Sequence, residues 1–315
     1  MITTTVATKS QNATPSRSYG GPVPSLTAAE ASDLFRCAPD ALLDVGAGDV
    51  AYRRVGSGPD VLFVHGWPVS GATFRTLLPH LSAQVTCHII DLPGAGSSRF
   101  GAATTLTVDQ HIATVRRVVD LLGLDQVAVV GHNSGGLIAR HALAGDARVR
   151  AMALIDTEQP HGLNWRFRSF LAVRNAPGVG GGLGWIAGQS RLRRSKFVFG
   201  DSFVDRSLLD GEFDEFFLQP LHVSHQRRAA AVKVLRSFDT QHIDQLTELH
   251  RRIGVPVQLV WGDRDPFFPV EWAEEMVGTF PDARLAVIRN ASLFSHEECP
   301  VDVAQAMLPV LLGSS

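Results

Sequence analysis

The sequence predicts an α/β fold: a mainly parallel sheet flanked by helices, with one helical insertion. Short apolar runs, which are typical of strands buried on both faces, alternate along the chain with amphipathic helical segments. Neighbouring parallel strands need crossover connections, and helices supply them in right-handed βαβ units. The alternation stops between about residues 160 and 253 and then resumes. We therefore expect an α/β core from residues 25–159 and 254–315, a helical cap at 160–253, and a mobile arm at 1–24.

The composition excludes several classes of protein. Of the 315 residues, 45% are hydrophobic and 19% are charged, which is typical of a globular chain. With 29 Lys and Arg against 31 Asp and Glu, the chain has no basic excess with which to bind nucleic acid. Its three cysteines, Cys37, Cys87 and Cys299, are too far apart for a disulfide framework or a metal site. We expect a cytoplasmic protein with no cofactor, metal or membrane partner, and the sequence leaves a homodimer open.

The first half of the expected core begins with a short helix. Residues 25–36 form it, with Ser25 or Thr27 as the N-cap. Val61–His65 is a continuous apolar run, as expected for a strand that is buried on both faces. In Val108–Leu122 the apolar residues recur with a period of about 3.6, which predicts an amphipathic helix. Further strands are expected at Asp49–Val55 and Val85–Asp91, and a helix at 71–81.

The second half of the core continues the alternation on both sides of the insertion. Val127–Val130 is a short buried strand that stops at a glycine, and an Ala- and Leu-rich helix follows at about 135–144. The remaining strands are expected at Val149–Asp156, Val257–Trp261 and Leu285–Ile288, with helices at Glu271–Val277 and Val301–Leu312.

The insertion at 160–253 has helical patterns, a glycine-rich run and no convincing buried strand. Its many aromatic residues favour a largely apolar pocket at the carboxyl edge of the sheet, where open α/β folds bind ligands. The expected partner is therefore a hydrophobic small molecule. The aromatic residues are Trp165, Phe167, Phe170, Trp185, Phe197, Phe199, Phe203, Phe213, Phe216 and Phe217.

A glycine-rich turn follows the strand at 127–130. Gly131–Gly136 reads GHNSGG, and glycine at its first and fifth positions allows a sharp reversal of the chain. The third residue, Asn133, then lies at a strained apex above the sheet, with the next N–H directed at whatever reacts there. This is the sequence pattern of a nucleophile elbow.

Four motifs in these positions resemble the α/β-hydrolase superfamily, and its capped branch of epoxide hydrolases, dehalogenases and esterases in particular. His65–Pro68 follows a buried strand, where the family places an oxyanion-binding loop. Asp91–Ser98 is similar to the family's DxxGxGxS turn, and Gly131–Gly136 is the elbow. Trp261–Pro266 looks like the loop that bears the acid of the catalytic triad, which maps to Asp265. The resemblance covers about residues 50–312.

The first departure from the family's pattern is at the apex of the elbow. Asn133 stands where the family has Asp or Ser, and a neutral amide is a very poor nucleophile. Ser134 comes one residue too late, because His132 does not suit the tight position that precedes the apex of its turn. We expect Ser134, together with Trp67, to contribute a backbone N–H to an oxyanion site, and His132 to belong to the same oxyanion and substrate-binding site.

The second departure is at the base. Aligning Glu297–Pro300 with the acidic pair and proline of the family puts Leu293 at the base position, and leucine cannot accept a proton. His296 follows three residues later and has two interpretations. It is either a structural histidine at a helix start or a displaced base that enters the site when its loop is rebuilt.

Three carboxylates are candidates to handle protons in the absence of that base. Asp265 becomes a base if the site is dry enough to raise its pKa. Asp156 and Glu158 follow the strand at 149–156, where some relatives place their acid. The competing interpretation is that Asp156 and Glu158 only cap the local loop.

The substrate class is narrowed by what the cap contains. Epoxide hydrolases use cap tyrosines, whereas the only tyrosines here, Tyr19 and Tyr52, lie outside the cap. Trp165 or Trp185 offers an indole N–H instead, unless these residues belong to the core of the cap. The haloalkane dehalogenases bind the halide with a Trp directly after the nucleophile and an Asn directly after the His-Gly motif. Those positions hold Ser134 and Trp67.

Three functional hypotheses follow. The first is an enzyme that acts on a hydrophobic or aromatic small molecule, by epoxide- or ester-type hydrolysis or by a non-covalent water addition, elimination or cyclisation. In it, Asn133 orients the substrate and Asp265 or His296 moves protons. The second is a binding protein that has kept the fold and lost catalysis. The third is an engineered Asp-to-Asn variant of a hydrolase, which explains Asn133 but not Leu293.

Overall fold

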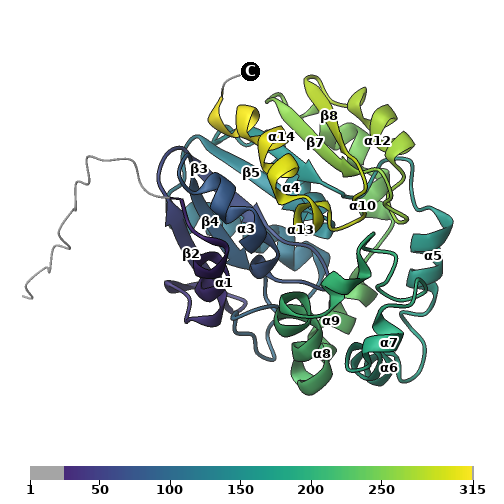
Figure 1. The fold of residues 1–315 in the computed structure, drawn as a ribbon. Helices are drawn as coiled ribbons and strands as arrows, with labels where there is room; N and C mark the ends of the chain where they lie inside the picture. The colour runs from purple at the N-terminus through teal and green to yellow at the C-terminus, as the bar shows by residue number, and fades with distance from the viewer. Residues whose placement is uncertain (1–24, 314–315) are drawn as a thin grey trace, which may run out of the picture.

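The computed structural model describes residues 25–313, so the arm expected at 1–24 lies outside the described residues. An eight-stranded sheet in the order β1-β2-β4-β3-β5-β6-β7-β8 forms the centre of the molecule (Figure 1). β1 and β2 are antiparallel to their neighbours, and all other pairs are parallel, as the alternation of elements predicts. The strands are β1 (Ala41–Asp44), β2 (Asp49–Gly56), β3 (Asp60–Val64), β4 (Thr86–Asp91), β5 (Val127–His132), β6 (Val149–Ile155), β7 (Val257–Gly262) and β8 (Ala283–Ile288).

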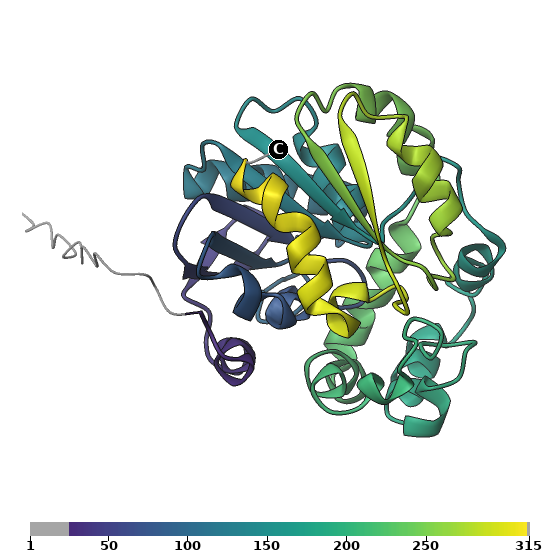
Figure 2. The same ribbon diagram turned by 45° about the horizontal axis from the view of Figure 1, so that its top comes forward.

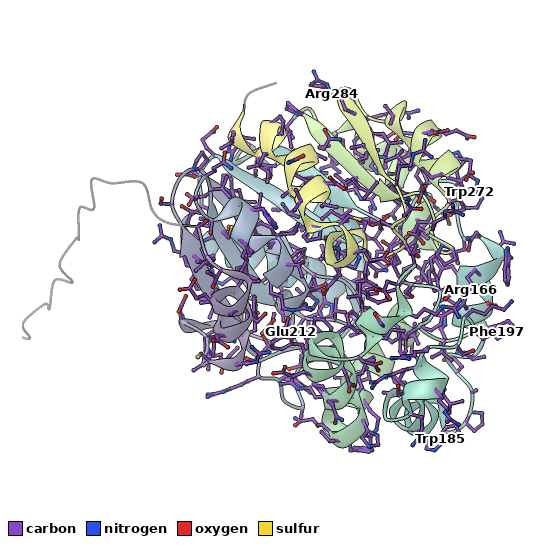
Figure 3. The ribbon with its side chains drawn as sticks, in the orientation of Figure 1. Arg166, Trp185, Phe197, Glu212, Trp272 and Arg284 are labelled. Atoms are coloured by element: carbon purple, nitrogen blue, oxygen red, sulfur yellow. The ribbon has the colours of Figure 1, made fainter. Side chains whose placement is uncertain are left out.

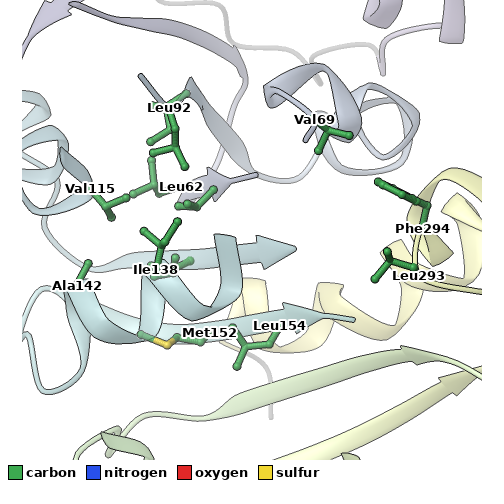
Figure 4. Packing of buried hydrophobic residues seen from close by; sticks show 14 of the residues in the cluster. Leu62, Val69, Leu92, Val115, Ile138, Ala142, Met152, Leu154, Leu293 and Phe294 are labelled. Carbon is green, nitrogen blue, oxygen red and sulfur yellow. The ribbon is translucent and has the colours of Figure 1, made fainter. Parts of the chain in front are cut away.

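Helices cover both faces of the sheet. The side chains of β3 alternate between the two hydrophobic clusters, because successive residues of a strand point to opposite faces. Val61 and Phe63 pack with residues of α2 and α14, whereas Leu62 packs in the cluster of α3 and α4 (Figure 4). The core helices are α1 (Ala28–Arg36), α2 (Leu78–Leu81), α3 (Val108–Leu122), α4 (Ser134–Leu143), α12 (Val270–Val277), α13 (Ser295–Glu298) and α14 (Pro300–Leu312).

The segment between β6 and β7 is helical and contributes no strand to the described sheet. Its helices gather at one end of the sheet, while α14 crosses a sheet face (Figures 1 and 2). They are α5 (Trp165–Ala172), α6 (Val179–Ala187), α7 (Ser190–Arg193), η2 (Arg206–Leu209), η3 (Asp214–Leu218), α8 (Gln219–Val223), α9 (His225–Ser237), α10 (Gln241–Asp244) and α11 (Leu246–Arg251).

Two local expectations differ from the structure. The helix expected at 71–81 is a 3-10 helix, η1 (Gly71–Thr76), followed by the short α2. Pro79 explains the break, since it has no N–H with which to bond the carbonyl of Arg75. The edge strand β1 was not expected from the sequence, because its four residues are too few to show an alternating pattern. Among residues 25–313, no helix combines the length and apolar character that a bilayer-spanning helix needs.

Candidate active site

The turn after β5 has the sharp geometry that its sequence predicts. Asn133 joins β5 to α4 with φ 52° and ψ −136°, a conformation that costs a non-glycine residue about 1–3 kcal/mol. Gly135 permits the close approach of the turn to β3, because a β-carbon there would lie 2.2 Å from the carbonyl oxygen of Val64. The strained backbone therefore holds Asn133 at the end of the central strand.

A covered cavity lies over this turn, and we call it the elbow cavity. It encloses about 770 Å³ of space, open solvent at its mouth included. Residues of the core and of the helical segment between β6 and β7 both line it, and most of the lining is aromatic or aliphatic. The residues are Trp67, Pro68, Val108, Asn133, Ser134, Ile138, Glu158, Phe167, Phe170, Leu171, Val198, Phe199, Ser202, Val234, Leu235, Phe238, Phe267, Phe268, Leu293 and Phe294.

The side-chain oxygen of Asn133 lies between two backbone N–H groups. The N–H of Ser134 donates to Asn133 Oδ1 at 2.6 Å, and the N–H of Trp67 lies 3.4 Å from the same atom. The Trp67 N–H also donates to the Ser134 hydroxyl at 3.0 Å. Convergent N–H donors of this kind stabilise an oxygen that gains negative charge in a reaction. Here the amide oxygen of Asn133 occupies their focus itself, so a ligand oxygen has to displace it.

Leu293 lines the elbow cavity, where the spacing to Glu297–Pro300 places the base of the family. His132 is fully buried and does not line the cavity; it instead holds the loop that carries Leu293, because its Nε2 lies 2.9 Å from the Leu293 carbonyl oxygen. Because a carbonyl only accepts, His132 Nε2 carries the proton. The aligned position thus presents an aliphatic side chain to the cavity.

His296 does not line the elbow cavity. It is fully buried, and its Nε2 lies 2.8 Å from the Thr73 hydroxyl. Its ring centroid is 4.3 Å from that of His132, and burial holds the pKa of both imidazoles below the ordinary value. This arrangement agrees with the structural interpretation of His296 and gives no direct path from its imidazole to a ligand near Asn133.

Asp265 does not line the elbow cavity, and one of its two carboxyl oxygens has no hydrogen-bond partner in the described residues. Its Oδ1 accepts the N–H groups of Phe267 and Phe268 at 2.7 and 3.1 Å. Its Oδ2 is buried without a hydrogen-bond partner in the described residues. Burial raises the pKa of Asp265 to about 8. The loop of Leu293 runs alongside, since the Arg264 N–H donates to the Ala291 carbonyl at 2.9 Å. An imidazole at the Leu293 position would be the natural partner of the free oxygen.

Asp265→Asn is expected to stabilise the protein more at pH 8 than at pH 5. In the unfolded chain this carboxyl loses its proton near pH 3.8, whereas in the folded protein burial retains the proton up to about pH 8. Between these values the unfolded state binds fewer protons, so the free energy of unfolding falls as the pH rises. The neutral amide removes that loss. Urea unfolding of the wild type and the variant at both pH values measures the difference in stability. An equal effect of the variant at pH 5 and pH 8 would contradict the prediction.

Glu158 is the carboxyl group that lines the elbow cavity. It is 1% exposed, and burial raises its pKa. The Thr157 hydroxyl lies 3.0 Å from Glu158 Oε2 and 2.8 Å from the Asn133 carbonyl oxygen, which ties the carboxyl to the elbow. The sequence placed Glu158 near this edge without distinguishing it from Asp156. Asp156 is instead fully buried and does not line the cavity. Its carboxylate accepts the Gly262 N–H at 2.7 Å and the Ser295 hydroxyl.

Two tryptophans considered from the sequence lie elsewhere. Trp165 and Trp185 are 74% and 60% exposed, and neither lines the elbow cavity. Trp185 lies at the outer edge of the cap helices (Figure 3). Phenylalanines of the cap, including Phe167, Phe170 and Phe199, line the cavity as the aromatic-rich insertion predicts.

The chemistry available to the site is therefore limited. The elbow cavity offers an amide, two backbone N–H donors, hydroxyl groups and one carboxyl group in apolar surroundings. An amide does not form the covalent intermediates that carboxylate or serine nucleophiles form. Within residues 25–313, no cluster of three or more His, Cys, Asp or Glu residues could hold a metal ion.

Known proteins are similar to this chain over most of its length. A family model described as alpha/beta hydrolase fold matches residues 59–300. Haloalkane dehalogenase 2 of Mycobacterium tuberculosis is 27% identical over 279 residues, which cover 84% of this chain and 92% of the relative. A pimeloyl-[acyl-carrier protein] methyl ester esterase of Aeromonas hydrophila is 29% identical over 269 residues, which cover 81% and 98%.

Solved structures agree with the sequence comparisons. The meta-cleavage product hydrolase of Pseudomonas fluorescens superposes with a TM-score of 0.73 at 17% identity, over 88% of this chain and 99% of that chain. At this identity the likeness concerns the fold alone.

Proposed function

The chain belongs to the α/β-hydrolase fold family, and from this premise we propose that it is an enzyme that converts a hydrophobic small molecule by proton transfer, without a covalent bond to the elbow residue. One observation carries the proposal: an amide, two convergent N–H groups and one carboxyl group meet in a covered apolar cavity. The names of the relatives, a dehalogenase and an ester esterase, indicate where a substrate search begins.

The N–H groups of Ser134 and Trp67 would bind an oxygen of the substrate. A carbonyl or hydroxyl oxygen displaces the Asn133 amide oxygen from their focus, and the Asn133 amide then turns to hydrogen-bond the ligand. Donors that are already aligned need no reorganisation when charge develops on that oxygen. Asn133 in this role binds and orients the substrate.

Glu158 would move the proton. Burial raises the pKa of the Glu158 carboxyl and so favours its protonated form, which suits a general acid that later acts as a base. A single acid–base group beside an oxygen-binding site is sufficient for elimination or for water addition. Two-step hydrolysis needs a nucleophile as well, which Asn133 does not provide.

Glu158→Gln is expected to lower kcat about 100-fold and to leave KM nearly unchanged, because the amide keeps the shape of the side chain and loses the proton. Asn133→Ala should instead raise KM and lower kcat, since it removes a binding contact. Mass spectrometry of a panel of hydrophobic esters, epoxides, alkyl halides and hydroxy compounds identifies the substrate on which both are measured.

Glu274→Gln is the matched control, because Glu274 is exposed on α12. Its turnover should equal that of the wild type. If Glu158→Gln and Asn133→Ala both leave turnover untouched, the reaction occurs elsewhere and the proposal fails.

A binding protein is the second candidate, and the occupied oxyanion position favours it. Asn133 Oδ1 satisfies the Ser134 N–H in the absence of any ligand, and Leu293 provides no base. In that case compounds of the same panel bind in the elbow cavity and are recovered unchanged.

A further inference from the structure

A second cavity adjoins the elbow cavity. Trp67, Ser134 and Ile138 line both. The Trp67 indole Nε1 donates to the carbonyl of Ala231 on α9 at 2.8 Å, which holds the ring against that helix. The second cavity encloses about 590 Å³, open solvent at its mouth included, and its walls are mostly apolar.

Arg227 on α9 brings a positive charge to this second cavity. Its Nη2 donates to the Ser98 carbonyl at 3.3 Å, and its Nη1 is buried without a hydrogen-bond partner. No carboxylate of residues 25–313 lies within ion-pair distance of it. A partly buried guanidinium without a counter-ion is costly, and an anion that enters the cavity would relieve that cost.

The nearest acidic residues are already engaged. Asp91 accepts the N–H groups of Gly71 and Ser97, each at 2.8 Å, and forms an ion pair with Arg53 at 3.4 Å. Glu215, which lines a recess next to Arg227, forms an ion pair with Arg36 at 2.8 Å. Both carboxylates therefore have other partners, and Asp91 acts on Arg227 only through its charge, without an ion-pair contact.

His111 adds an acceptor to the same cavity. Its Nε2 lies 3.1 Å from the Pro93 carbonyl oxygen, so Nε2 carries the proton. Its Nδ1 is then an acceptor, and it is buried with no partner in the described residues. Burial lowers the pKa of His111 to about 4, which keeps the ring neutral at pH 7. A ligand hydroxyl or N–H would satisfy it.

The cap is the positive part of the chain. Residues 160–253 contain 14 Arg and Lys against nine Asp and Glu, a net charge of +5, whereas the whole chain carries −2. A positive surface raises the local concentration of anions and speeds their approach. Arg227, whose guanidinium lies 5.6 Å from the centroid of the Phe100 ring, thus belongs to the part of the chain with the positive net charge.

We propose that the second cavity binds an apolar carboxylic acid, with the carboxylate on Arg227, the chain along the apolar walls, and a hydroxyl group, where present, on His111. The site is distinct from the elbow cavity and does not depend on the reaction proposed above. Arg227 supplies a charge-assisted donor, which suits a carboxylate better than a neutral oxygen.

Calorimetry with octanoate, 3-hydroxyoctanoate and octanol tests the site. Octanoate should bind at least about tenfold more tightly than octanol, and 3-hydroxyoctanoate more tightly than octanoate. Arg227→Met should remove the preference for octanoate over octanol and leave octanol binding unchanged. His111→Phe should remove only the gain from the hydroxyl group.

Arg228→Met is the matched control, because Arg228 lies on the same helix and donates to the Leu221 carbonyl instead of lining the cavity. It should bind octanoate as the wild type does. The site is refuted if octanoate binds no more tightly than octanol, or if Arg227→Met and Arg228→Met weaken octanoate equally. Near-ultraviolet circular dichroism checks that each variant is folded.

Discussion

Asn133→Asp combined with Leu293→His is expected to create hydrolytic activity about 10³- to 10⁴-fold above that of the wild type. The first substitution supplies a carboxylate nucleophile at the elbow, next to the N–H groups of Ser134 and Trp67. The second places an imidazole in the elbow cavity, on the loop that bonds the segment of Asp265 through the Arg264 N–H and the Ala291 carbonyl. Hydrolysis of alkyl halides, epoxides and esters measures the gain.

The single variants separate the two halves of this reaction. Asn133→Asp alone should form a covalent alkyl-enzyme that persists, because no imidazole at the Leu293 position activates the water that would release it. Intact-protein mass spectrometry detects that adduct. Asn133→Asp with Leu293→Gln is the control, since a glutamine cannot act as the base. A folded double variant that binds substrate and forms neither adduct nor product would show that the elbow no longer supports nucleophilic attack.

Full activity of Asn133→Asp alone would favour the engineered origin of Asn133.

Arg140→Met is expected to destabilise the protein by about 3 kcal/mol. Arg140 is fully buried on α4, and it donates to the carbonyl oxygens of Gly136 and Glu158 at 3.0 and 2.7 Å. It also bonds His250 Nε2 at 2.9 Å and the Thr157 hydroxyl at 3.0 Å. Methionine fills a similar volume but leaves these acceptors without a donor. Urea unfolding measures the loss.

The control for this prediction is Arg251→Met, because the Arg251 side chain is 67% exposed. It should change stability by less than about 0.5 kcal/mol. Arg140→Met should also weaken ligand binding in the elbow cavity, since Thr157 bonds the Asn133 carbonyl and Glu158 lines the cavity. Unchanged stability of Arg140→Met would show that other groups or water satisfy the exposed acceptors.

The sequence predicted the parts of the site that depend on local pattern. The GHNSGG turn fixed the place of Asn133, since a strand, two glycines and a helix leave the backbone few alternatives. The spacing to Glu297–Pro300 likewise placed Leu293 at the cavity wall.

The sequence did not reveal the features that depend on tertiary burial. Nothing local separates Glu158, which lines the elbow cavity, from Asp156, which is sealed behind it. Arg227 and Arg228 are adjacent on α9, and only packing decides which of them reaches the second cavity. Trp165 and Trp185 look like pocket residues by composition, yet the packing of the cap turns them toward solvent.

Trp67 forms hydrogen bonds with both the core and the helical segment between β6 and β7. Its backbone N–H points at the Asn133 oxygen, and its indole bonds Ala231 on a cap helix. A displacement of α9 on ligand entry would therefore be transmitted through one residue to the oxygen-binding position. A ligand bound in either the elbow cavity or the second cavity would then change the ligand affinity of the other cavity by the same factor, since such free-energy coupling is reciprocal.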